Sequence, residues 1–245
     1  MRRITVIMWG ILVAVAATAR PATFPPEVTY RIYVSGELAG KSVIKITEKG
    51  DALVFEGHTT VDWDEFQLDL RCRTEVAADD LEPRSFSYEG RRGGANVSGT
   101  VWVDGDSITG DLVFGEEHYP SSKNLSGRKV FFENYMVEHQ VLLLNTVAAS
   151  EELYQRVSVF FPIDFIASPC LALIESEVEV ATTPPSVCRK YHFSIQQGSV
   201  FFGYFDPKRK LPVYMDFPAS NTEIFLEGAF DDPPLTKYTR PEASQ

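Results

Sequence analysis

The chain has 245 residues, of which 44% are hydrophobic and 23% are charged, and both values are ordinary for a globular protein. Its formal net charge of −11 disfavours nucleic acid as a partner, because an acidic surface repels phosphate groups. The length suits a single domain with one sizeable core.

The first 19 residues have the pattern of an export signal. A basic start at Arg2 and Arg3 precedes a mostly apolar run over 4–17, and Ala19 completes a small-x-small cleavage site. Neither this run nor any later stretch reaches the roughly 20 apolar residues that a spanning helix needs. We therefore expect a periplasmic or extracellular protein, cleaved near Ala19, with no transmembrane segment in the mature chain.

The remainder is expected to form one β-rich domain over 20–232. Two consecutive prolines at 233–234 mark its end, and the residues 233–245 are expected to form a flexible polar tail. Between 28 and 114, apolar and polar residues alternate and turn residues recur every 8 to 12 positions, which is typical of antiparallel strands.

Two neighbouring strands can be paired residue by residue. The inward residues of 53–63 have odd numbers and those of 66–76 have even numbers, so the connecting loop must have an even length. A two-residue loop at 64–65 satisfies this rule, and a four-residue loop of the same parity is the alternative. The two-residue loop opposes four pairs, namely Val61 with Leu68, Phe55 with Thr74, Glu56 with Arg73 and Thr60 with Asp69.

Two tryptophans lie on different faces in this pattern. Trp63 falls on the inward face and is expected in the core or in a cavity wall. Trp102 falls on the polar side, where it is either covered by a loop or exposed as a stacking platform for a sugar or peptide. His58, Asp62 and Asp64 share a polar strand face and could in principle bind a divalent metal, but the segment is flat and open. We therefore expect a solvated face, no metal and no cofactor.

The alternation breaks between Phe131 and Ala149. Apolar residues recur there at helical spacing, and Leu142 and Leu143 make the segment apolar on nearly every side. A helix of this kind is buried, so we expect a helix at about residues 135–148. The predicted fold is therefore mainly β, a curved antiparallel sheet or half-barrel wrapped around one buried helix.

Three cysteines in an exported chain favour one disulfide and one free thiol. Cys170 and Cys188 flank a segment rich in proline that could reverse the chain, which makes them the expected disulfide. Cys72 lies on an alternating apolar face and is expected to be a buried thiol.

The order of elements resembles a known family. The segments that carry the resemblance are 30–34, 42–46, the helix with His139, and 202–206 followed by a basic turn. They are similar to bacterial exported domains of unknown function related to the lipoprotein-localisation half-barrel, the LolA/LolB-like fold. The resemblance implies a sheet folded over a helix and an apolar concavity that takes acyl chains or another apolar ligand. The chain lacks the carriers' anchor and hallmark motifs, so lipoprotein shuttling does not carry over.

The functional expectation is an exported binding protein that holds a lipid-like or other apolar small molecule in the concave face. Its expected ligand-binding residues are Trp63, Phe131, Phe132, Tyr135, His139 and Trp102. One alternative is a hydrolase or lyase acting on the cell envelope or on polysaccharide, with His139 or His192 as acid or base. The other is a scaffold protein of an envelope complex with an unidentified protein partner. Standard catalytic motifs are absent from the sequence.

Overall fold

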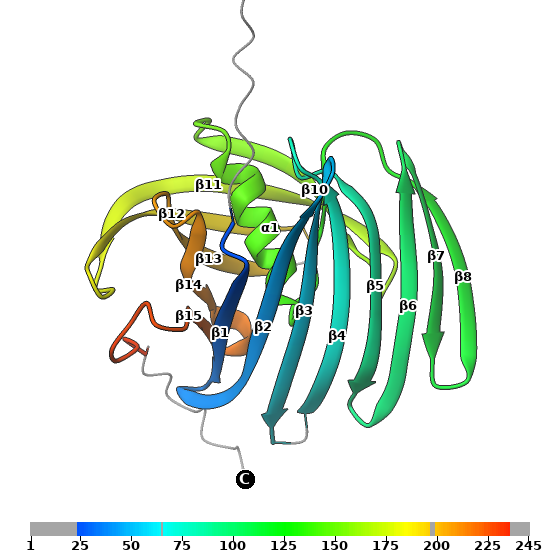
Figure 1. The fold of residues 1–245 in the computed structure, drawn as a ribbon, viewed down its shortest axis with the longest axis horizontal. Helices are drawn as coiled ribbons and strands as arrows, with labels where there is room; N and C mark the ends of the chain where they lie inside the picture. Colours follow the sequence, from blue (N-terminus) through cyan, green and yellow to red (C-terminus); the bar gives the residue numbers. More distant parts are fainter. Residues whose placement is uncertain (1–23, 65, 197–198, 236–245) are drawn as a thin grey trace, which may run out of the picture.

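One large sheet curls around one helix in this protein (Figure 1). The computed structural model describes residues 24–64, 66–196 and 199–235, so the predicted export signal and most of the predicted tail lie outside the described residues. Within those ranges the fold is mainly β, and the predicted half-barrel around a buried helix is confirmed.

The first half of the described chain is an antiparallel meander of eight strands. The turn between the sixth and seventh strands contains Gly105, whose φ of 56° favours glycine. The eight strands are β1 (Glu27–Val34), β2 (Glu37–Lys49), β3 (Ala52–Trp63), β4 (Phe66–Ala77), β5 (Pro83–Arg92), β6 (Ala95–Asp104), β7 (Ser107–Phe114) and β8 (Glu117–Asn124).

The second half begins with the short strand β9 (Lys129–Phe131), which pairs in parallel with β10 beyond the helix α1 (Val137–Ala148). Because β15 pairs with β1, the two halves form one continuous sheet of 15 described strands, with β8 and β9 at its edges. The remaining elements are β10 (Tyr154–Phe161), β11 (Ile166–Val180), β12 (Ser186–Ile195), β13 (Val200–Asp206), β14 (Leu211–Phe217), the 3-10 turn η1 (Pro218–Ser220) and β15 (Thr222–Leu226).

The register of β3 and β4 confirms the pairing expected from the two-residue loop. All four opposed pairs are present, including Val61 with Leu68 and Glu56 with Arg73. The pairing follows because a slip by one residue would turn Phe55 and its apolar neighbours toward solvent.

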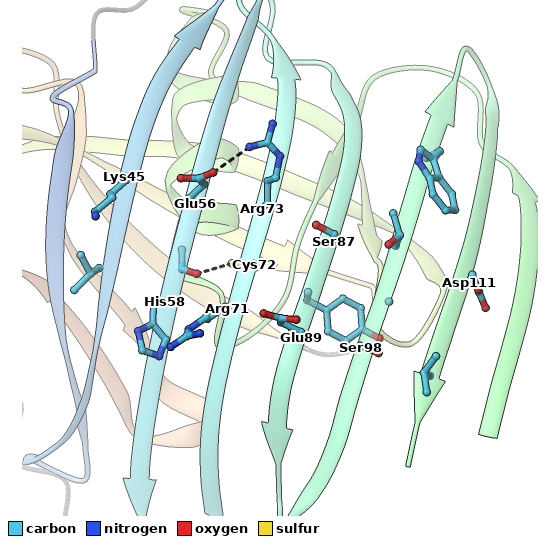
Figure 2. Close-up of a pocket in the computed structure, with 17 residues that line it drawn as sticks. Lys45, Glu56, His58, Arg71, Cys72, Arg73, Ser87, Glu89, Ser98 and Asp111 are labelled. Carbon is cyan, nitrogen blue, oxygen red and sulfur yellow. Dashed lines mark hydrogen bonds and ion pairs between the residues drawn. The ribbon is translucent and has the colours of Figure 1, made fainter. Parts of the chain in front are cut away.

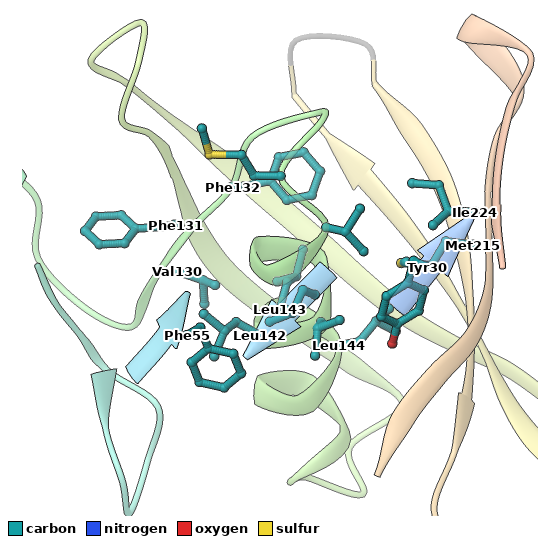
Figure 3. Packing of buried hydrophobic residues seen from close by; sticks show 14 of the residues in the cluster. Tyr30, Phe55, Val130, Phe131, Phe132, Leu142, Leu143, Leu144, Met215 and Ile224 are labelled. Atoms are coloured by element: carbon teal, nitrogen blue, oxygen red, sulfur yellow. The ribbon is translucent and has the colours of Figure 1, made fainter. Parts of the chain in front are cut away.

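The helix α1 fills the concave side of the sheet. Figure 1 shows it between the strands of the first half of the chain and those of the second half. Figure 3 shows Leu142, Leu143 and Leu144 among aromatic and aliphatic side chains from both halves. Each of these leucines is at most 2% exposed. The sheet approaches closely, since a Cβ at Gly203 would lie 2.6 Å from Leu144 Cδ2. No helix in the described ranges is long and apolar enough to cross a membrane.

The predicted disulfide between Cys170 and Cys188 is wrong, and both side chains are buried free thiols. Strands β11 and β12 form a long hairpin in which Cys170 faces Ile195 and Cys188 faces Val178. The two cysteines therefore lie about 26 Å apart along the ladder, whereas a disulfide needs Cα atoms within about 7 Å. The prolines do reverse the chain, but the register places the cysteines toward opposite ends of the hairpin.

Candidate functional site

A broad hollow lies on the outer face of the sheet, away from the helix (Figure 2). It has a volume of about 810 Å³ and extends across β2, β3, β4, β5, β6 and β7. We call it the outer trough and define it by two cross-strand rows and by Trp102. The first row is Lys45, Glu56, Arg73, Ser87, Thr100 and Asp111; the second is Val43, His58, Arg71, Glu89, Ser98 and Val113.

Strand alternation places these side chains together. Successive residues of a strand point to opposite faces, so His58 lies on the outer face while Gly57 faces the helix. Antiparallel registry then brings His58 opposite Arg71, and Arg71 opposite Glu89. The rows are therefore a consequence of the same register that builds the core.

The floor of the trough is made of short side chains. Ser87, Ser98 and Thr100 lie on β5 and β6, between the long arginines of β4 on one side and Asp111 of β7 on the other (Figure 2). Trp102 lies on the outer face, as the alternation predicts, and is 50% exposed. Of the two alternatives for Trp102, the exposed one is observed.

Ion pairs fix several charged side chains of the trough. Arg73 Nη1 lies 3.0 Å from Glu56 Oε1, and Arg73 Nη2 lies 3.3 Å from Glu75 Oε2. His58 Nε2 lies 2.8 Å from Asp69 Oδ1 at the trough's border. Such exposed pairs add little stability, and they place the carboxylates of Glu56 and Glu75 against the guanidinium of Arg73.

The lining is electrically balanced. It contains three cationic side chains, Lys45, Arg71 and Arg73, and three carboxylates, Glu56, Glu89 and Asp111. With His58 neutral the formal charge of the lining is zero, although the whole chain carries −11. The trough is thus a neutral polar surface on an acidic protein.

The inner face of the same strands holds a different set of polar groups. The carboxyl of Glu138 occupies the space that Gly57 leaves, since a Cβ there would lie 2.7 Å from Glu138 Oε2. The Cys72 thiol donates a hydrogen bond of 2.6 Å to Glu138 Oε1, while Oε2 has no partner among the described residues. Burial raises the pKa of Glu138 to about 7, and burial together with this carboxylate raises the pKa of Cys72 well above its ordinary value.

His139 lies in the interior with no exposed surface. Its Nε2 is 3.2 Å from Thr74 Oγ1, and its ring is 4.8 Å from the ring of Phe86. Burial lowers the pKa of His139 to about 3, so the imidazole is neutral at neutral pH. His192 lies on β12, in the other half of the sheet, with Nδ1 3.4 Å from Glu175 Oε1.

Of the aromatic residues expected to bind an apolar ligand, those other than Trp102 lie in the core or pack against it. Phe131 and Phe132 are at most 2% exposed, and Trp63 packs against the same core. Tyr135 stacks near Phe66, at a ring distance of 4.8 Å, beside a void of about 30 Å³ at the start of the helix. That void has room for about one water molecule. These four residues thus belong to or pack against the core, and Trp102 lies apart from them on the outer face of the sheet.

Among the described residues, no group of three or more His, Cys, Asp or Glu side chains could hold a metal ion. His58 pairs with Asp69 on the neighbouring strand and not with Asp62. Of the trough residues, the sequence prediction includes only Trp102 as a ligand contact, because a charged residue on a strand face usually indicates solvated surface. The signal that reveals the trough is cross-strand: the registers of the five strand pairs from β2 to β7 together align its two rows.

Comparison with protein-family models found no match, and neither the curated proteins nor the solved structures gave one.

Proposed function

We propose that this chain is a binding protein that holds a polar ligand in the outer trough. The observation that carries the proposal is a hollow of about 810 Å³, within the usual size range of ligand sites, lined by polar groups and one exposed tryptophan. Trp102, His58 and Arg73 are supported by a rigid sheet, so a ligand would meet side chains that are already positioned. Export through residues 1–19 remains part of the proposal.

A variant that fills the trough tests this function. Ser98→Trp places a large ring on the floor, and Ser176→Trp, on an exposed position of β11, is the matched control. The melting temperature of each is measured with a panel of neutral oligosaccharides, acidic oligosaccharides and short peptides. We expect at least one compound to stabilise the wild type and Ser176→Trp but not Ser98→Trp. Equal stabilisation of all three proteins, or of none, would contradict the proposal.

A second candidate function is carriage of an apolar ligand in the concave face, as the family resemblance implies. It is favoured by three buried polar atoms on the first turns of α1 that have no hydrogen-bond partner within the described ranges, namely Glu138 Oε2, His139 Nδ1 and Gln140 Oε1. Such atoms destabilise the packed state and would gain hydration if this end of the helix moved away. That movement would vacate space for an apolar molecule.

Extraction of the purified protein with organic solvent, followed by mass spectrometry, tests the second candidate. A bound lipid-like molecule, or saturable fatty-acid binding that a larger side chain at Gly203 removes, would support it. Reproducibly empty protein with no fatty-acid affinity would count against it.

A further inference from the structure

We propose that the ligand of the outer trough is a neutral, hydroxyl-rich oligosaccharide, one ring of which stacks on Trp102. This inference rests on the proposed function and adds the chemical class of the ligand. Four properties of the trough carry it: charge balance, position on the sheet, side-chain chemistry and length.

The balance of charge favours a neutral ligand. Three cations and three carboxylates line the trough, and Arg73 is already paired with Glu56 and Glu75. An anionic ligand would lie against Glu89 and Asp111 on a protein of net charge −11, whereas a cationic one would lie against Lys45 and the arginines. A ligand without net charge avoids both costs.

The position on the sheet disfavours an extended peptide. Peptides commonly bind sheets by adding a strand at an edge, through backbone hydrogen bonds. The trough lies on the face of β3, β4, β5 and β6, each of which already pairs with a neighbour on both sides. The ligand must therefore be recognised by side chains alone.

The side chains present suit sugar rings. The hydroxyls of Ser87, Ser98 and Thr100 both donate and accept, and the fixed carboxylate and guanidinium of Glu56 and Arg73 can bind adjacent hydroxyl groups in pairs. A pyranose ring has an apolar face of C–H groups that packs on an exposed indole such as that of Trp102. The hydrocarbon chain of a lipid would leave most of these polar groups without partners.

The length of the trough suits a chain of several sugar units. Its lining extends from Val43 on β2 to Val113 on β7, which is five strand spacings or about 24 Å. One sugar unit in a linear chain is about as long as one strand spacing. An oligosaccharide lying across the strands would therefore place successive rings over successive strands.

Isothermal titration calorimetry of the mature chain tests the inference. The ligands are linear hexasaccharides of glucose, xylose and N-acetylglucosamine, an acidic hexagalacturonate, and an uncharged Gly-Ser hexapeptide. We expect one or more neutral hexasaccharides to bind more tightly than the acidic sugar and the peptide, with affinity falling for shorter chains. Trp102→Ala should weaken that binding about tenfold, and Trp102→Phe should restore part of it.

Two controls separate the outcomes. Trp63→Phe changes a tryptophan that packs against the core, so sugar affinity should stay the same. Circular dichroism melting of each variant shows that it is folded. Tighter binding of the peptide or of the acidic sugar, abolished by Ser98→Trp, would overturn this inference while leaving the proposed function in place. Sugar binding that Trp102→Ala does not change, or no sugar binding at all, would also overturn it.

Discussion

The two faces of β3 and β4 carry polar groups in opposite conditions. On the outer face, Arg73 is partly exposed and ion-paired, and His58 is partly exposed and hydrogen-bonded to Asp69. On the inner face, Glu138 and His139 contact the same strands in the buried interior, and each has a side-chain atom without a partner among the described residues. Neighbouring residues of these two strands therefore point alternately to an exposed face and to a buried face.

The contrast teaches which side chains decide stability and which are available for binding. Exposed ion pairs contribute little to folding, so the outer face can be changed without unfolding the protein. Apolar packing of α1 holds the fold, and the buried polar groups set how stability depends on pH. The predictions below break or sharpen this contrast, from the largest effect to the smallest.

Leu143→Ala should have the largest effect. Leu143 has no exposed surface and lies in the middle of α1 (Figure 3), so truncation leaves a cavity and should cost about 2–5 kcal/mol of unfolding free energy. Trp102→Ala, a larger truncation at a half-exposed site, should cost less than about 1 kcal/mol. Urea unfolding of both variants checks the comparison. Equal losses would mean that the two faces do not differ as described.

Glu138→Gln should change the pH dependence of stability. The carboxyl has a pKa of about 7 in the fold against an ordinary 4.5, so its stabilising protonated form is fully present below pH 4.5 and is lost as the pH rises through 7. This loss is at most about 1.4 kcal/mol per pH unit. Glu133 acts in the same direction, with a pKa raised by burial to about 8.

Stability measured by urea unfolding at steps from pH 4.5 to 8 should therefore fall less steeply in Glu138→Gln than in the wild type. His139 acts in the opposite direction: its pKa of about 3 lies below its ordinary 6.5, so its contribution is full above pH 6.5 and is lost as the pH falls toward 3. Identical dependence of the unfolding free energy on pH in the two proteins would show that burial does not raise the pKa of Glu138.

Arg73→Ala should have a small effect on folding. The Arg73 side chain is 37% exposed, and those of its partners Glu56 and Glu75 are 53% and 32% exposed, so we expect a loss below about 1 kcal/mol, smaller still at high salt. A loss of unfolding free energy above about 2 kcal/mol would mean that the ion pairs of Arg73 help to determine stability. The outer face would then not differ from the inner face in the way described.

A reducing agent should have no effect. All three cysteines are free and buried, so titration of the unfolded chain without reductant should find three reactive thiols, and the melting temperature should not change with reductant. A single reactive thiol would mean that a disulfide forms and that the register of β11 and β12 is different.

Local patterns in the sequence predict much of this fold. The period-two alternation and the parity of the 64–65 loop predict the register of β3 and β4, because one slip would expose Phe55. The all-round apolar run containing Leu142 and Leu143 predicts the buried helix. The predicted disulfide is wrong because two cysteines that flank a turn are not necessarily opposite each other in the register of the two strands. The trough is still harder to predict from the sequence, since its rows form only when the registers of six strands are combined.

The most direct test of the account is an NMR titration of the ¹⁵N-labelled mature chain with the tightest-binding neutral hexasaccharide. The account predicts that the indole N–H signal of Trp102 and the amides around Arg71 and Ser98 shift, while those of α1 stay in place. Shifts concentrated in residues 137–148, with Trp102 unmoved, would contradict it and move the binding site to the concave face.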